Sequence, residues 1–243
     1  MSSLVNPVVA GITVRATLGR RRAILFAIPA VILIALTLIL RVSHPAGGGN
    51  WPDVVLGDFG FSVLLPLTAL VVGTGVLGAE IDDGSAIHLL ATPIRRSTIV
   101  VTKFVVAAAL TMVFAAIPEL LAGLLAPASR KLAVALFVGA LVGSVIYSAV
   151  FVLASVLTTR AIAVGLLYVL VWEALLGNLV GGVRILSVAH YSLGIANAIY
   201  PDPNFRAGLT LATSVTLGVI VTIGALILAT RRLSAFAIKG EPA

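Results

Sequence analysis

Residues 23–40, AILFAIPAVILIALTLIL, form an uncharged stretch that lies between Arg22 and Arg41. Twelve of these eighteen residues are Leu, Ile, Val or Phe, and about twenty mostly apolar residues in a helix cross the hydrocarbon core of a bilayer. A helix is favoured because it closes its backbone hydrogen bonds internally where no water is present. This stretch therefore predicts a membrane-spanning helix.

Similar apolar stretches follow along the rest of the chain. Together with the first they predict six spans, at about residues 23–40, 59–79, 99–126, 132–157, 161–180 and 207–230. Of the 243 residues, 60% are hydrophobic and only 10% are charged, whereas a water-soluble domain has about 25% charged residues. We therefore predict an all-α polytopic membrane protein in which residues 23–243 form one transmembrane domain, and the composition excludes a water-soluble enzyme.

The basic residues predict how the spans are oriented. Six spans place both termini on one side, and eleven of the 16 Lys and Arg residues then fall on that side. Because cytoplasmic loops are enriched in basic residues, we expect a multi-pass protein of the plasma (inner) membrane with both termini in the cytoplasm. The net charge of +7 is distributed between apolar runs, so we expect no nucleic-acid partner.

Two segments outside the spans are partly apolar. In residues 1–22, Val8, Ile12 and Ala16 recur four positions apart and three arginines follow, which predicts an amphipathic helix in the interface, held against anionic membrane lipid. A frayed tail that ends in arginines is the alternative. Residues 183–206 are too polar to span and too apolar for a free loop, so we expect short helices that re-enter the outer leaflet.

The cytoplasmic segment at residues 80–97, between the second and third predicted spans, has the features of a short ordered helix. Asp82 or Asp83 can cap its N-terminus, where carboxylates face the positive end of the helix. Pro93 ends it, because the residue before a proline avoids the helical conformation. Two interpretations follow: an ordinary connector packed on the bilayer, or a helix that docks on a partner.

This segment resembles the coupling region of type-2 ABC transporter permeases. The likeness lies in the acidic residues, Gly84-Ser85, Leu89-Leu90-x-x-Pro93, Arg95-Arg96 and the nearby Lys103. The six predicted spans, the chain length, the basic N-terminal segment and Trp172-Glu173 in the fifth span are similar as well. One departure is that Ala86 and His88 stand where many members have a large apolar residue and a carboxylate.

The resemblance implies an assembly with two copies of a cytoplasmic ABC ATPase subunit, which would hold ATP and Mg²⁺, and with a second permease, identical or paralogous. It also implies a surface that docks on the ATPase. The residues of this coupling surface are Asp82, Asp83, His88, Leu89, Leu90, Arg95 and Arg96.

The sequence contains neither an ATP-hydrolysis motif nor a metal-binding pattern. A phosphate-binding loop needs Gly-Lys followed by Ser or Thr, and the sequence has no Gly-Lys dipeptide. His44, His88 and His190 lie in three different segments, and there is no cysteine. We therefore expect a non-hydrolysing subunit without a metal or cofactor of its own.

Three polar residues inside predicted spans are candidates for a translocation pathway: Glu119 in the third span, and Glu173 and Asn178 in the fifth. A carboxylate near the middle of a membrane costs about 2.5–3.5 kcal/mol and must face protein or water. Each glutamate either makes a structural hydrogen bond or, for Glu173 in particular, lines a central cavity that prefers cationic or amphipathic cargo. Gly139 and Gly143 permit close approach of another helix, within the chain or from a second subunit.

These features favour the permease subunit of an ATP-driven ABC exporter that effluxes small amphipathic drugs or antibiotics. Lipid or polysaccharide export is the alternative within the family. A secondary transporter would show paired ionisable residues in two related halves, a pattern that the sequence does not display. A non-transporting membrane scaffold remains open as an interpretation.

Overall fold

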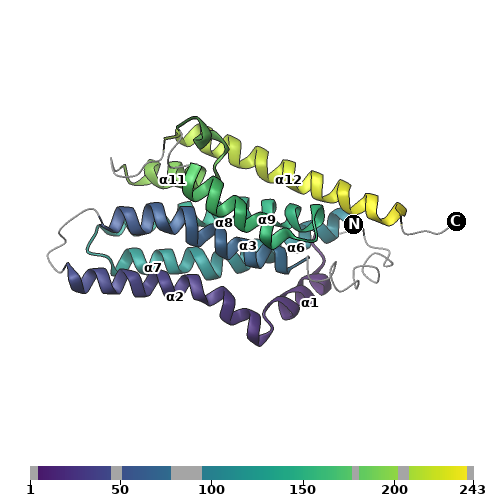
Figure 1. Cartoon of the computed structure of the whole chain (residues 1–243), viewed down its shortest axis with the longest axis horizontal. Coiled ribbons are helices and arrows are strands. Elements are labelled where there is room, and N and C mark those ends of the chain that lie inside the picture. The colour runs from purple at the N-terminus through teal and green to yellow at the C-terminus, as the bar shows by residue number, and fades with distance from the viewer. Residues whose placement is uncertain (1–4, 45–50, 78–94, 177–180, 202–207, 240–243) are drawn as a thin grey trace.

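The computed structural model describes residues 5–44, 51–77, 95–176, 181–201 and 208–239, and throughout these ranges the regular elements are helical. The long helices lie side by side along the longest axis of the molecule (Figure 1). Among the described residues, five helices are long and apolar enough to cross a membrane: Ala23–Ser43, Asp53–Gly75, Arg96–Leu125, Arg130–Leu157 and Leu211–Ala235. The predicted fold class, an all-α membrane protein, is therefore confirmed.

The N-terminal helix α1 (Pro7–Thr17) leads into the first long helix, α2 (Arg20–Ser43). The side chain of Asn6 caps α1 by accepting hydrogen bonds from the first turn. Helix α1 buries Val9 and Thr13, whereas Val8 is 68% exposed. A helix is thus present where sequence predicts one, and its exposed apolar side chains fit the expected position in the membrane interface.

The second and third spans each combine a π-helical part with an α-helical part. Their elements are η1 (Asp53–Leu64), α3 (Leu65–Gly75), α6 (Arg96–Thr111), η2 (Met112–Ala116) and α7 (Ile117–Leu125). Pro66 and Pro118 lie in the first turn of α3 and α7, directly after a π-helical part. Because proline has no N–H, the regular hydrogen-bond ladder is interrupted there, and the wider helical turn precedes each proline.

Helix α8 (Arg130–Leu157) is central, and it packs against α3, α6, α7, α11 (Val188–Ile199) and α12 (Leu211–Lys239). Gly139 is in contact with α11, where an added Cβ would lie 2.8 Å from the Ser192 carbonyl oxygen. Gly143 faces the same serine. The close helix approach that these glycines permit is therefore made within the chain.

The fifth predicted span, residues 161–180, is the one whose crossing is not confirmed. Helices α9 (Ala161–Leu167) and η3 (Tyr168–Leu176) run on continuously, and residues 177–180 of the predicted span lie outside the described residues. The segment predicted to re-enter the outer leaflet forms η4 (Gly181–Leu186) and α11, and α11 is largely buried against α8 and α12. Re-entry into the leaflet stays a prediction.

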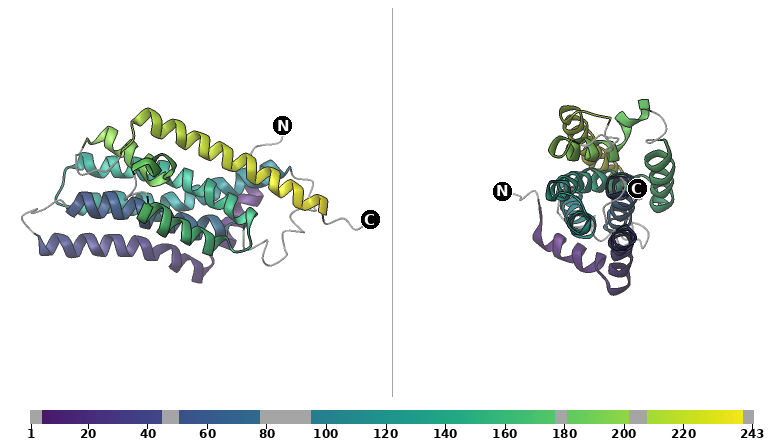
Figure 2. Two further views of the ribbon diagram at one scale, coloured as in Figure 1. Left: turned by 45° about the horizontal axis from the view of Figure 1, so that its top comes forward. Right: turned by 90° about the vertical axis from the view of Figure 1, so that its left-hand side faces the viewer.

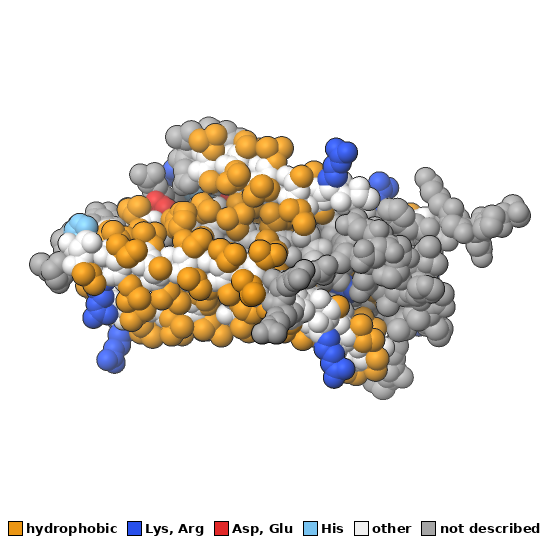
Figure 3. All heavy atoms as spheres, turned by 60° about the horizontal axis from the view of Figure 1, so that its bottom comes forward, with side chains coloured by type: hydrophobic (Ala, Val, Ile, Leu, Met, Phe, Trp, Pro, Cys, Tyr) orange, Lys and Arg blue, Asp and Glu red, His pale blue; other side chains and the backbone are white. Residues whose placement is uncertain are grey.

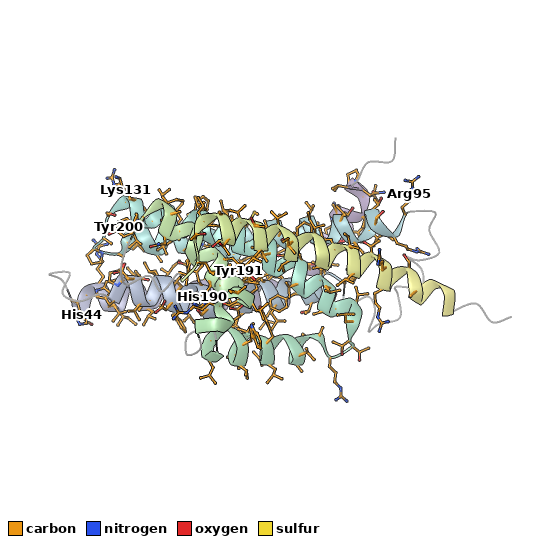
Figure 4. The ribbon with its side chains drawn as sticks, turned by 90° about the horizontal axis from the view of Figure 1, so that it is seen from above. His44, Arg95, Lys131, His190, Tyr191 and Tyr200 are labelled. Atoms are coloured by element: carbon orange, nitrogen blue, oxygen red, sulfur yellow. The ribbon has the colours of Figure 1, made fainter. Side chains whose placement is uncertain are left out.

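The two ends of the bundle are distinct. His44, Lys131 and Tyr200 lie at one end and Arg95 at the other (Figure 4). Helix α1 and the C-terminal end of α12 both lie at the Arg95 end, and α2 and α12 lie on opposite sides of the bundle (Figures 1 and 2). Between the two ends the visible face is covered by hydrophobic side chains (Figure 3). This arrangement agrees with both terminal segments on one side of a membrane, and the cytoplasmic identity of that side stays a prediction.

Candidate functional site

Glu173, in η3, is buried in a cluster of hydrogen-bond donors. Its Oε1 accepts from the Tyr168 hydroxyl at 2.6 Å and from the Val188 backbone N–H at 2.9 Å. Its Oε2 accepts from the Ser187 hydroxyl and from the Ala189 N–H at 3.4 Å. A carboxylate has about four acceptor positions, so the carboxylate of Glu173 is fully used by these four donors.

These bonds explain why Glu173 can be buried. Val188 and Ala189 form the first turn of α11, where backbone N–H groups have no partner within the helix and the helix dipole favours negative charge. Ser187 is the N-cap residue of the same helix. Glu173 therefore anchors α11 to the fifth predicted span. Its expected place in a translocation pathway stays a prediction, and Asn178 lies outside the described residues.

Glu119, in α7, has a different environment. Its side chain is 2% exposed, and its Oε2 has no hydrogen-bond partner among the residues that the structure describes. A Cβ atom added at Gly60 of η1 would collide with Glu119 Oε1, so the absence of a side chain at Gly60 provides the space for the carboxylate. From the sequence, a structural hydrogen bond is one of the two roles considered for Glu119. Its Oε2 makes no such bond to any described residue.

A small cavity of about 10 Å³ lies beside Glu119, between α2, α3 and the η2–α7 helix. This volume is about the minimum that holds one water molecule. The polar lining consists of Glu119 and Thr68, and the Thr68 hydroxyl already donates to the Leu64 carbonyl at 2.8 Å. The other lining residues are apolar: Pro29, Ala30, Leu33, Leu64, Leu65, Phe114, Ala115 and Pro118.

Lys103, in α6, is completely buried, at 0% exposed. Its Nζ donates a hydrogen bond of 2.6 Å to the carbonyl oxygen of Val76, the residue that caps the C-terminus of α3. The carbonyl end of a helix carries partial negative charge, which favours a cation. This bond joins the two helices that flank residues 78–94.

A second bond adds α1 to the same end of the bundle. The Thr102 hydroxyl accepts a 3.0 Å hydrogen bond from the Asn6 backbone N–H and donates to the Thr98 carbonyl at 2.6 Å. Thr102 is the neighbour of Lys103. The starts of α1 and α6 and the end of α3 are therefore held together at one place, which we call the stem junction (Asn6, Val76, Thr102 and Lys103).

The family model of the ABC-2 family transporter protein matches residues 18–130. This part of the chain, slightly less than half of it, is similar to the ABC-2 transporter family. The matched region runs from the start of α2 to the start of α8 and includes most of the stem junction. No curated protein matches the chain.

The ABC-2 match supports a membrane permease of an ABC transporter, which is a transport component that associates with an ABC ATPase subunit. Members of this family are generally non-catalytic. In the described part of the chain, no group of three or more His, Cys, Asp or Glu residues could hold a metal ion.

The ABC-2 coupling surface expected from the sequence is described only at its end. Arg95 is exposed and precedes α6, and Arg96 is partly buried in the first turn of that helix. Asp82, Asp83, His88, Leu89 and Leu90 lie outside the described residues. Whether these seven residues contact an ATPase stays a prediction.

Sequence reasoning missed the burial of Lys103, which it includes only as a basic residue near the coupling segment. The spacing is a signal, because Ile99, Lys103 and Val106 recur at helical intervals and therefore share one face of α6. The structure shows that all three are buried. Three of the four donors to Glu173 carry no comparable signal, because they lie on a later segment of the chain.

Proposed function

We propose that the chain is the membrane-spanning subunit of an ATP-driven exporter of small amphipathic molecules. It would act with a second permease and with two copies of a cytoplasmic ABC ATPase, which bind ATP and Mg²⁺ and perform the hydrolysis. The single observation that supports this most is the ABC-2 match over residues 18–130, because it includes the whole segment from which docking is expected.

The stem junction supports a mechanical role for residues 80–97. Closure of the ATPase subunits around ATP would push this segment, and the Lys103–Val76 bond would make the end of α3 and the start of α6 move together. The second and third spans would then tilt and open the permease to the opposite side. Such a shift requires that ATP binds one arrangement more tightly than the other.

The proposed cargo is a small amphiphile of the drug or antibiotic type. The described residues form one helical bundle and no separate domain that could bind a polymer. An amphiphile partitions into the bilayer, from which it can reach a site between helices. Lipid molecules and polysaccharides are the alternatives that a transport assay with defined cargo would separate.

Co-purification tests the ATPase association. We expect the tagged chain, isolated from its own cell membrane, to retain an ATPase at about one copy per permease. The double variant L89D/L90D should lose the ATPase and still insert into the membrane, because charged residues cannot replace an apolar docking contact. The matched control is Ala198→Asp, an exposed position in α11 near the opposite end of the bundle.

Two outcomes would contradict the proposal. If L89D/L90D retains the ATPase as well as the wild-type chain does, residues 89 and 90 have no docking role. If the correctly folded wild-type chain retains no ATPase under any condition, a membrane scaffold becomes the better interpretation.

A further inference from the structure

The two buried glutamates differ in what they can still bind. All acceptor positions of Glu173 are taken by donors of the chain itself. Glu119 Oε2 has no such donor in the described ranges, although the side chain is 2% exposed. A buried carboxylate without a partner is costly, and within a membrane segment it indicates a functional site.

The surroundings of Glu119 restrict the class of ligand. An inorganic cation such as Ca²⁺ or Mg²⁺ requires about six oxygen ligands. The cavity offers one carboxylate and the hydroxyl of Thr68, which is already bonded, while the rest of the lining is apolar. A positive charge with apolar substituents, as in a lipophilic ammonium or phosphonium ion, matches both parts of this lining.

The cavity of about 10 Å³ is too small for such an ion unless a helix moves. Among the helices that line the cavity, α2 packs least tightly against the rest of the bundle. Only 17% of its most apolar eighteen residues are buried, against 61% for the second and third spans. Its buried side chains, Phe26, Leu33 and Thr37, form a narrow stripe. Near the C-terminal end of α2, Arg41 donates a 2.8 Å hydrogen bond to the carbonyl oxygen of Leu125, the last residue of α7.

We propose that Glu119 binds the positive group of a lipophilic cation that enters from the bilayer between α2 and α7. The carboxylate supplies the counter-charge, and the apolar residues of α2 and α3 contact the hydrocarbon part of the ligand. The inference rests on the proposed function in treating this ligand as export cargo. From the sequence, a preference for cationic cargo is one of the roles considered for Glu173. In this proposal, the preference belongs to Glu119 instead.

The test uses two probes of nearly the same shape and opposite charge, tetraphenylphosphonium and tetraphenylborate. Equilibrium binding is measured with the full chain in lipid nanodiscs, after subtraction of binding to empty nanodiscs. We expect the wild-type chain to bind tetraphenylphosphonium and the Glu119→Gln variant to bind it at least tenfold more weakly. Binding of tetraphenylborate should not weaken, which also shows that the variant is folded.

Two further variants locate the site. Gly60→Ala adds a methyl group where Glu119 Oε1 lies, so it should displace the carboxylate and weaken binding of the cation while the charge is kept. Glu173→Gln changes a carboxylate whose acceptors are all used, so it should leave the ratio of cation to anion affinity unchanged.

The outcomes separate the explanations. Equal weakening of both probes in Glu119→Gln, or no change in either, would overturn the proposal, as would a wild-type chain that binds no tetraphenylphosphonium. Loss of the cation preference in Glu173→Gln instead of Glu119→Gln would place the site at Glu173. Because no ATPase is present in this assay, failure to bind the cation is distinguishable from failure of the chain to associate with an ATPase.

Discussion

Replacement of Lys103 by methionine tests the stem junction directly. Methionine is unbranched and of similar length, so it fills the same space without the ammonium group. The variant loses the hydrogen bond to the Val76 carbonyl, and a bond to a charged group contributes about 1.5–3 kcal/mol. The buried carbonyl also loses its donor, while release of the ammonium from its buried position offsets part of the loss.

We expect a net decrease of about 2 kcal/mol in the free energy of unfolding. For a protein of this size that corresponds to a Tm lower by about 4–8 °C. Thermal unfolding of the purified chain in one fixed detergent measures the change. Lys131→Met is the matched control, because Lys131 is exposed at the opposite end of the bundle, and its Tm should stay within about 2 °C of the wild type.

The same variant has a functional readout that a merely structural role would not change. If α3 and α6 move together through this bond, Lys103→Met should lower the amount of cargo exported per ATP hydrolysed in the assembled transporter, with ATPase association retained. An unchanged Tm together with an unchanged export ratio would refute the reasoning about the stem junction.

Two further predictions concern Glu173 and His190, whose Nδ1 lies 3.0 Å from the hydroxyl oxygen of Ser187, one of the donors to Glu173. Glu173→Ala removes the acceptor for four donors, so we expect a loss of about 2–4 kcal/mol, seen as a lower Tm and as faster amide hydrogen exchange at the start of α11; unchanged exchange there would contradict the anchoring role. Burial, and secondarily the charge of Arg184, lowers the pKa of His190 to about 4 from its ordinary value of 6.5. Because the folded chain binds this proton more weakly than the unfolded chain, the contribution of His190 to stability should be constant above pH 6.5 and decrease as the pH falls from 6.5 towards 4. In unfolding measurements across this range the His190→Gln variant should show a smaller decrease, and an equal decrease would show that other groups cause it.

The membrane helices could be predicted from sequence because composition alone determines them. The stretch at residues 23–40 has no charge over a span-length run, and lipid excludes any conformation that leaves backbone groups unpaired. The helix ends were less predictable. In the sixth span the apolar pattern ends at residue 230, while helix α12 continues through Arg231 and Arg232, because hydropathy does not record where a helix ends.

The candidate site was predictable only in part. The sequence identifies Glu119 and Glu173 as unusual, because a carboxylate within an apolar run has no inexpensive environment. It does not distinguish them, because the difference lies in long-range contacts. The donors to Glu173 include residues 14–16 positions later in the chain, and the space around Glu119 depends on Gly60 of another helix.

Two prolines on different helices line the Glu119 cavity: Pro29 in the interior of α2 and Pro118 in the first turn of α7. A helix that bends at a proline breaks no hydrogen bond at that residue, since none exists there. The curvature of both helices can therefore change at this depth at little energetic cost. The two prolines thus allow both helices to bend beside Glu119, the carboxylate with an unpaired oxygen in the described residues.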